Sequence, residues 1–304
     1  MKTGLLVTFH SSPSTLNLKP SNLKLVLRLA PTLGILTILL GTSLFYGMAQ
    51  SLGYLTIIGE KELSLTAYKN LITSQGTAGR EFWVSLGFSL WISLASTILS
   101  TIGALFLATL LNRRPSRLDT FALNWNLAFP HLVWGVFVLL LLAQSGLLAR
   151  WAGALGIIEA PAQFPVLVRD RFGFGIIFTY IGKEIPFLTL LILALLRTQS
   201  DSYLRVAENL GANRWQRFRL VTLPLVRPAL ISGSLLVFAY VFGAYEVPAL
   251  LGVRYPRTLP VLALESFTNP DLHARAEGMA ISLIIALIVL LIAGFARAKE
   301  EISG

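Results

Sequence analysis

Ionisable side chains inside long apolar runs are the residues of this chain best placed to do chemistry. Lys183 and Glu184 are adjacent within the apolar run of about 173–196, and Pro186 follows two residues later. A charged side chain at the centre of a lipid core costs about 3 kcal/mol on insertion scales, so such residues usually serve a purpose. The motif predicts either a polar site on a transport path or a proline kink whose lysine reaches outward to the lipid interface.

A second motif of the same kind lies late in the apolar run of about 229–251. There Tyr245 and Glu246 are followed by Pro248. Broken helices that expose polar groups mark substrate routes in transporters. The alternative is a carboxylate at the interfacial end of a helix, and the occurrence of the pattern in two runs favours the transport path. His131, which follows Pro130, is instead expected to be an interhelical hydrogen-bond partner.

A stripe of hydroxyl groups runs along a third apolar run. Ser85, Ser89, Ser93, Thr97 and Thr101 recur every four residues, which places them along one slowly rotating face of a helix. Small residues allow helix backbones to approach closely in lipid, so we favour a helix-packing seam. The alternative is a polar wall of a conduit, with Ser89 and Ser93 on the transport path.

The composition requires membrane helices to hold these motifs. Of the 304 residues, 55% are hydrophobic and 13% charged, and the mean hydropathy is +0.70. About 20 consecutive apolar residues cross a bilayer core. We predict an all-α, polytopic membrane protein with an N-terminal tail (1–24), a transmembrane domain (25–299) and a C-terminal tail (300–304). The six predicted spans are about 25–50, 81–111, 121–144, 173–196, 229–251 and 278–296.

The distribution of basic residues predicts the orientation. If the N-terminus is cytoplasmic, the inward-facing segments carry more Lys and Arg than the outward-facing ones, as the positive-inside rule requires. Both termini and the segment 202–224 are then cytoplasmic. The net charge of +10 therefore reflects cytoplasmic loops rather than nucleic-acid binding.

Several kinds of chemistry have no support in the sequence. The chain has no cysteine, and its three histidines are far apart, so neither disulfides nor a metal-ligand pattern is predicted. It contains no G-x-x-x-x-G-K-[ST], H-E-x-x-H or G-x-S-x-G motif. We therefore expect a protein that is not an enzyme and holds no cofactor, metal ion or ATP of its own.

The longest polar interlude of the C-terminal half, residues 202–227, predicts two short helices joined at Gly211. Asp201 or Ser202 is expected to cap the first helix, and Asn213 with Gln216 to form a capping box for the second. Pro224 then marks a turn back to the membrane. The segment indicates a docking element, and the alternative is an amphipathic helix that rests on anionic lipid.

This segment resembles the cytoplasmic loop of binding-protein-dependent ABC importer permeases. The family pattern begins with Glu-Ala-Ala and has a glycine six residues after the glutamate. It ends with a Leu-Pro pair whose proline lies thirteen residues after the glycine. Val206-Ala207 occupy the alanine positions, Gly211 the glycine position and Leu223-Pro224 the closing pair. Residues 183–187 and 243–252 are also similar to permeases of polyamine and sulfate importers.

The resemblance implies a type I importer permease in a prokaryotic cytoplasmic membrane that works by alternating access. ATP and Mg²⁺ would be bound by separate ATPase subunits. A second permease subunit, identical or different, would complete the path, and an extracytoplasmic binding protein would deliver a polyamine or another small solute to the outer loops 51–80, 146–172 and 252–277. The ATPase-coupling residues would be Arg205, Val206, Ala207, Glu208, Gly211, Trp215, Leu223 and Pro224. The translocation path would include Lys183, Glu184, Pro186, Tyr245, Glu246, Pro248, Ser89 and Ser93.

One departure from the pattern affects the expected partner. Arg205 stands where the family has a glutamate thought to pair with a basic residue of the ATPase. Such a pair is impossible here unless Glu208 substitutes for it, or unless the ATPase surface carries an acid instead. The main functional alternative is a transporter or channel driven by an ion gradient, with Lys183, Glu184 and Glu246 as coupling groups. A membrane scaffold without transport is a further alternative, which would leave the intramembrane charges unexplained.

Overall fold

The structure is a computed structural model that describes residues 20–112 and 117–303. Within these ranges the chain is helical, and its only β-type pairing is an isolated bridge between Leu55 and Glu60. The chain divides into two compact units, residues 1–47 and residues 48–304. The first contains most of a single long helix, and the second contains all the predicted site residues. The all-α expectation is confirmed.

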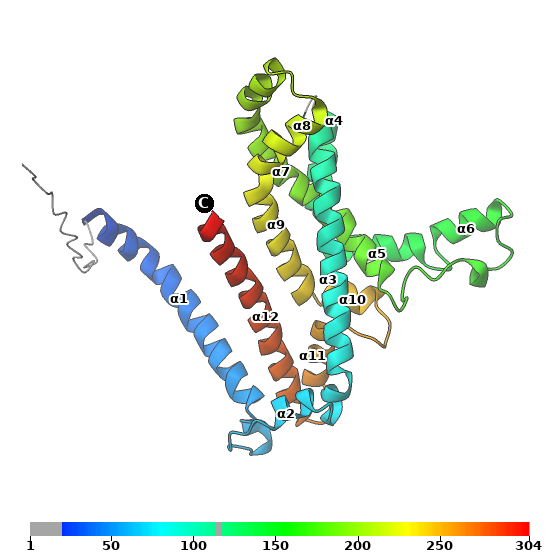
Figure 1. Cartoon of the computed structure of the whole chain (residues 1–304). Coiled ribbons are helices and arrows are strands. Elements are labelled where there is room, and N and C mark those ends of the chain that lie inside the picture. Colours follow the sequence, from blue (N-terminus) through cyan, green and yellow to red (C-terminus); the bar gives the residue numbers. More distant parts are fainter. Residues whose placement is uncertain (1–19, 113–116, 304) are drawn as a thin grey trace, which may run out of the picture. The chain divides into compact units, whose positions relative to one another are not determined.

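The helices alternate between long apolar rods and short connecting elements (Figure 1). They are α1 (Pro20–Ser51), α2 (Thr66–Ile72), α3 (Gly76–Leu111), α4 (Arg117–Ala128), α5 (His131–Leu142), α6 (Leu147–Ala154), α7 (Phe174–Asn209), α8 (Arg214–Arg217), α9 (Leu223–Gly243), α10 (Glu246–Leu251), α11 (Leu259–Phe267) and α12 (Ala274–Ser303). Two 3₁₀ turns, Thr56–Ile58 and Pro161–Gln163, and a π-helical segment, Phe218–Thr222, connect them.

Six helical segments of the described chain are long and apolar enough to cross a membrane, as predicted. They are Leu27–Ser51, Gly76–Leu111, His131–Ala154, Phe174–Arg197, Arg214–Gly243 and Ala274–Gly294. The third begins at His131 because Pro130 interrupts the apolar run between α4 and α5. The fifth begins early, because α8, the π-helical segment and α9 follow one another without a break.

The polar interlude at 202–227 differs from its predicted form in two respects. Its first helix is the end of α7, which continues through 197–209 because no glycine or proline interrupts it, so a cap at Asp201 or Ser202 is wrong. The turn expected at Pro224 is also wrong, because this proline lies in the first turn of α9, which continues the π-helical segment Phe218–Thr222 without a break.

The remaining local predictions for this segment are confirmed. Gly211 has a φ of +79°, the left-handed conformation that commonly ends a helix. The backbone N–H of Gln216 donates to Asn213 Oδ1 at 2.9 Å, and the N–H of Asn213 donates to Gln216 Oε1 at 2.8 Å. Gly211 and this capping box together fix the turn between α7 and α8.

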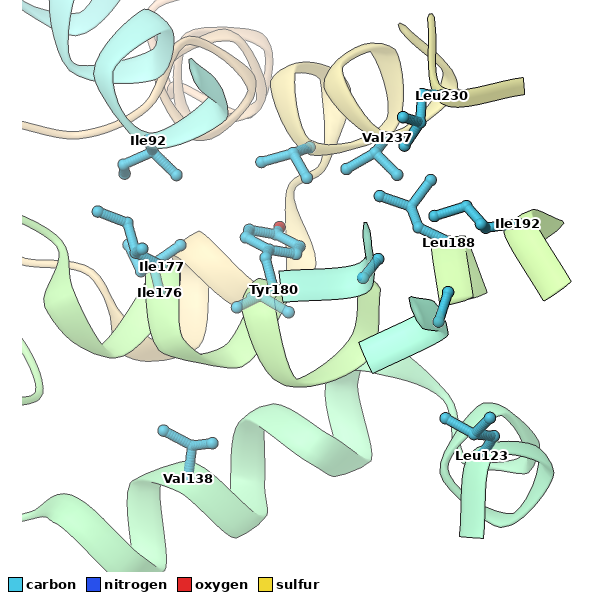
Figure 2. Packing of buried hydrophobic residues seen from close by; sticks show 14 of the residues in the cluster. Ile92, Leu123, Val138, Ile176, Ile177, Tyr180, Leu188, Ile192, Leu230 and Val237 are labelled. Carbon is cyan, nitrogen blue, oxygen red and sulfur yellow. The ribbon is translucent and has the colours of Figure 1, made fainter. Parts of the chain in front are cut away.

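The main core of the second unit lies where α7 packs against α3, α5 and α9. Figure 2 shows Tyr180 on α7 with Val237 of α9 to one side and Val138 of α5 to the other. Gly233 permits a close approach, since a Cβ atom there would lie 2.8 Å from Leu188 Cδ2. Many large apolar side chains of α3 and α5 point outward and are exposed, as expected of helices that face lipid.

A second apolar cluster joins α2, α3, α9, α11 and α12. In Figure 1, α2 and α11 lie at one end of the second unit, and α8 lies at the other end. α9 therefore extends from the turn around Gly211 to this second cluster, to which it contributes Phe238 and Phe242.

Candidate translocation and coupling sites

Lys183 does not reach outward to the lipid interface. Its side chain is 2% exposed, and Nζ donates to the backbone oxygens of Asn126 and Phe129 at 2.6 and 2.7 Å. Pro130, which has no N–H, follows the end of α4, so the Asn126 carbonyl lacks its usual donor four residues on and accepts only a long bond of 3.4 Å from the Phe129 N–H. A cation at a helix C-terminus also interacts favourably with the helix dipole. Lys183 therefore stabilises the break between α4 and α5, which corrects the snorkelling alternative.

Glu184 and His131 connect α7 to the first turn of α5. Glu184 Oε1 lies 2.9 Å from His131 Nε2, and the glutamate is buried. The expectation that His131 is an interhelical partner is confirmed. The His131 ring is also 4.5 Å from the Tyr240 ring on α9, between ring centroids. Three helices thus converge on one polar and aromatic cluster.

An open cleft of about 550 Å³ borders this cluster. We call it the break cleft, because the ends of α4 and α5 form one wall. Backbone that is not helical is tolerated at membrane depth where protein buries it or where it lines a cavity, and both conditions are met here. The cleft is lined by Leu127, Ala128, Phe129, Pro130, His131, Lys183, Glu184, Phe187, Leu236, Val237 and Tyr240.

The second charged motif lies at another helix break. α9 ends at Gly243, and α10 begins at Glu246, so Tyr245 and Glu246 stand at the junction with exposed side chains, while Pro248 is buried. α10 packs against α5 and α7, and its residues Val247 and Leu251 lie in the same apolar cluster as Tyr180. The tertiary structure therefore brings the two predicted motifs to the same region. Pro186 is half-buried within a continuous α7.

The hydroxyl stripe of α3 faces its neighbours. Ser89 Oγ accepts from the backbone N–H of Leu259 at 2.7 Å and so caps α11, and Ser93 Oγ donates to the carbonyl of Ser89. Thr101 Oγ1 lies 2.8 Å from Ser234 Oγ on α9. This arrangement agrees with a packing seam, and a role for Ser89 and Ser93 on the path stays a prediction.

The predicted coupling residues surround the Gly211 turn. Arg205, Val206 and Glu208 are exposed on the last turns of α7, and Ala207 is half-buried. Trp215 on α8 is exposed and stacks on Phe218, with ring centroids 5.6 Å apart. Leu223 and Pro224 begin α9, half-buried and exposed respectively.

Two polar contacts near the α2–α11 end had no signal in the sequence. Glu277 on α12 accepts from the backbone N–H of Ala78 at 2.7 Å, from Thr77 Oγ1 at 2.9 Å and from Asn70 Nδ2 at 2.9 Å. Arg257 pairs with Glu81 and Glu265. The partners of Glu277 are about 200 positions away, and Glu81 is 176 positions from Arg257, so spacing within one motif does not predict these contacts.

Comparison with known proteins places this geometry in context. Residues 100–298 match the family described as "Binding-protein-dependent transport system inner membrane component". The chain is 31% identical over 217 residues to the inner membrane ABC transporter permease protein YnjC of Escherichia coli K12, covering 66% of this chain and 39% of YnjC. It is 30% identical over 213 residues to the molybdenum transport system permease protein ModB of Mycobacterium bovis, covering 68% and 76%.

A third relative and two solved structures extend the comparison. The thiamine transport system permease protein ThiP of E. coli K12 is 27% identical over 214 residues, and the match covers 39% of its length. The fold resembles a bacterial ABC transporter that imports alginate, with a TM-score of 0.72, 16% identity and coverage of 91% and 96%. A bacterial alginate ABC transporter in complex with an alginate pentasaccharide-bound periplasmic protein gives a TM-score of 0.74, with 17% identity and coverage of 91% and 93%.

Proposed function

Since this chain belongs to the binding-protein-dependent inner membrane components of ABC importers, we propose that its Gly211 turn couples solute transport to ATP hydrolysis in a separate subunit. It is a multi-pass permease of the cytoplasmic membrane. ATP and Mg²⁺ bind to the partner, and the turn transmits the partner's movement. The observation that carries this proposal is the continuity of α7 from the turn to the break cleft.

The mechanism follows from the stiffness of the two helices that leave the turn. α7 has 36 residues and is therefore about 54 Å long. It carries Glu184 at one wall of the break cleft, while the helical stretch 214–243 carries Tyr240 at another. A rigid-body displacement of the turn would move both walls relative to α5, which supports alternating access.

The expected partners follow the same geometry. A second permease subunit, identical or different, would complete the path, because the break cleft is open rather than enclosed by this chain. A solute-binding protein is implied by the family, and segments 51–80, 146–172 and 252–277 are the proposed contacts on the outer side. Both termini would be cytoplasmic.

We propose a small cationic solute, such as a polyamine, as the substrate. Glu184 and the aromatic ring of Tyr240 line the break cleft, and Glu246 is exposed at the junction of α9 and α10; carboxylates and an aromatic ring together attract ammonium groups. The named relatives concern molybdenum and thiamine, so the test must include an oxyanion. The assay is the binding of spermidine, thiamine and molybdate to the cognate binding protein by calorimetry, and preference for molybdate would contradict this substrate class.

Reconstitution of the complete transporter tests the coupling proposal. In Gly211→Val, a side chain at a φ of +79° adds about 1–2 kcal/mol of strain and should lower solute uptake per ATP hydrolysed. Gly87→Val is the control, because Gly87 also has open space around its Cβ position but no positive φ. Gradient-driven uptake without any ATPase would support the alternative of a secondary transporter and contradict the proposal.

A further inference from the structure

The turn between α7 and α9 carries an exposed apolar surface, which we call the tip face. Its members lie on the last turns of α7, directly after α7 and on α8: Tyr203, Arg205, Val206, Leu210, Arg214 and Trp215. Leu210 is 82% exposed and Trp215 66% exposed. Apolar side chains gathered on one exposed surface usually mark a docking site.

The length of α7 places the tip face beyond the hydrocarbon of the membrane. The apolar span of α7 ends at Arg197, and the helix continues to Asn209. At 1.5 Å per residue, Leu210 is about 20 Å beyond Arg197 along the helix axis. The headgroup region is only about 6 Å deep on each side of the core. The tip face therefore projects into water, which favours a protein over lipid as the group that covers it.

The charge of the tip face has one sign. Residues 203–227 contain five arginines and a single glutamate, Glu208. Glu208 Oε1 accepts from Arg217 Nη1 at 2.6 Å, so an arginine of the same segment neutralises it. Arg205 and Arg214 are exposed and make no ion pair with the part of the chain that the structure describes. Glu208 therefore cannot substitute for an acid at position 205 without losing Arg217.

We propose that the ATPase subunit receives the tip face in a groove with an apolar floor and a carboxylate that faces Arg205. This inference rests on the proposed coupling of the Gly211 turn to an ATPase and adds the charge of the partner surface. Val206 and Leu210 would fill the apolar floor. The guanidinium of Arg205 would form a charge-assisted, planar contact with the acid.

Charge reversal at Arg205 tests whether the facing surface of the ATPase carries a negative charge. The complete transporter is purified through a tag on this chain, and the retained ATPase is measured at several salt concentrations. Arg205→Glu should lower ATPase retention by roughly fivefold, and Arg205→Lys should retain most of it. The matched control is Arg171→Glu, because Arg171 is an exposed arginine near the opposite end of α7 and should have no effect on retention.

Cross-linking identifies the facing acid. Because the chain has no cysteine, Val206→Cys supplies a single thiol at the tip face, and its cross-link locates the adjoining ATPase segment. Replacing an acidic residue of that segment by arginine should restore ATPase retention to Arg205→Glu. Restoration by the paired change supports the charge contact, since a purely structural defect in the turn would persist.

Three outcomes overturn the inference. Full ATPase retention by Arg205→Glu would do so, as would a cross-linked segment without an acidic residue. The third is ATPase retention that depends on the phosphatidylglycerol content of the sample and is unaffected by substitution of Arg205. That result would indicate that lipid, not the ATPase, covers the tip face. In all three, the wild type still retains the ATPase and the proposed function stands. If the wild type retains no ATPase, and Gly211→Val leaves uptake unchanged, the proposed function itself fails.

Discussion

At the scale of single residues, Lys183 shows how a membrane protein uses a charge without exposing it. Its Nζ atom donates to two carbonyls at the end of α4, where the helix geometry leaves acceptors without donors. The adjacent Glu184 lines the same break cleft and contacts His131 there. Adjacent residues of one motif thus have different tasks, one stabilising the wall of the cleft and the other presenting a carboxylate to it.

The first prediction tests the structural role of Lys183. Lys183→Met should destabilise the protein by about 2–4 kcal/mol, because two backbone carbonyls at membrane depth lose their donor. The measurement is thermal or denaturant unfolding of the purified protein in detergent.

Thr189→Val is the control for Lys183→Met. Thr189 is equally buried on α7, and its hydroxyl has no hydrogen-bond partner among the described residues, so its removal should cost little. Equal stability of Lys183→Met and Thr189→Val would show that Lys183 does not hold the end of α4.

At the scale of elements, helix ends are tied together by side chains from distant parts of the chain. The first turn of α3 has no cap from Gln75, and Glu277 of α12 accepts from its Ala78 N–H instead. Gly76 is required at this junction, since a Cβ atom there would lie on the Glu277 carboxylate. Ser89 similarly caps α11 from α3. These contacts fix α11 and α12 against α3 near one end of the bundle.

The second prediction tests this junction. Glu277→Ala should lower the free energy of unfolding by about 3 kcal/mol, because one backbone and two side-chain donors lose a buried charged acceptor. Unfolding in detergent measures the effect, and Glu62→Ala serves as the control because Glu62 is exposed and forms no ion pair with the described residues. A loss no greater than that of Glu62→Ala would contradict the capping role.

At the scale of the whole molecule, the membrane and the partners decide which surfaces are functional. Apolar side chains exposed on the sides of the membrane helices face lipid and need no further explanation. Those of the tip face lie beyond the apolar span of α7 and do need one. The orientation of the chain in the membrane therefore determines whether the tip face lies on the cytoplasmic side, where it can meet an ATPase.

The third prediction concerns orientation. Single cysteines are introduced at Leu210, in the tip face, and at Leu155, just after α6, both of which are highly exposed. A membrane-impermeant maleimide applied to intact spheroplasts should label Leu155→Cys at once and Leu210→Cys only after lysis. The reverse order of labelling would place the N-terminus outside and exclude the proposed coupling.

The sequence by itself determined the membrane class, six apolar spans and the local structure of the Gly211 turn. These follow from interactions between residues close in the chain: apolar runs long enough for a bilayer, a glycine that accepts a positive φ, and a capping box. The relation to ABC permeases followed from the same segment, because its pattern is also local.

Only the tertiary structure decided what the buried charges contact. Lys183 meets α4, Glu184 meets His131, and Glu277 caps α3, each across a separation in sequence that no motif spans. It also showed that α7 continues through 197–209, because helix propagation needs only the absence of a breaker and overrides a possible cap. Local patterns thus specify the helices, and long-range packing specifies which of their polar groups meet.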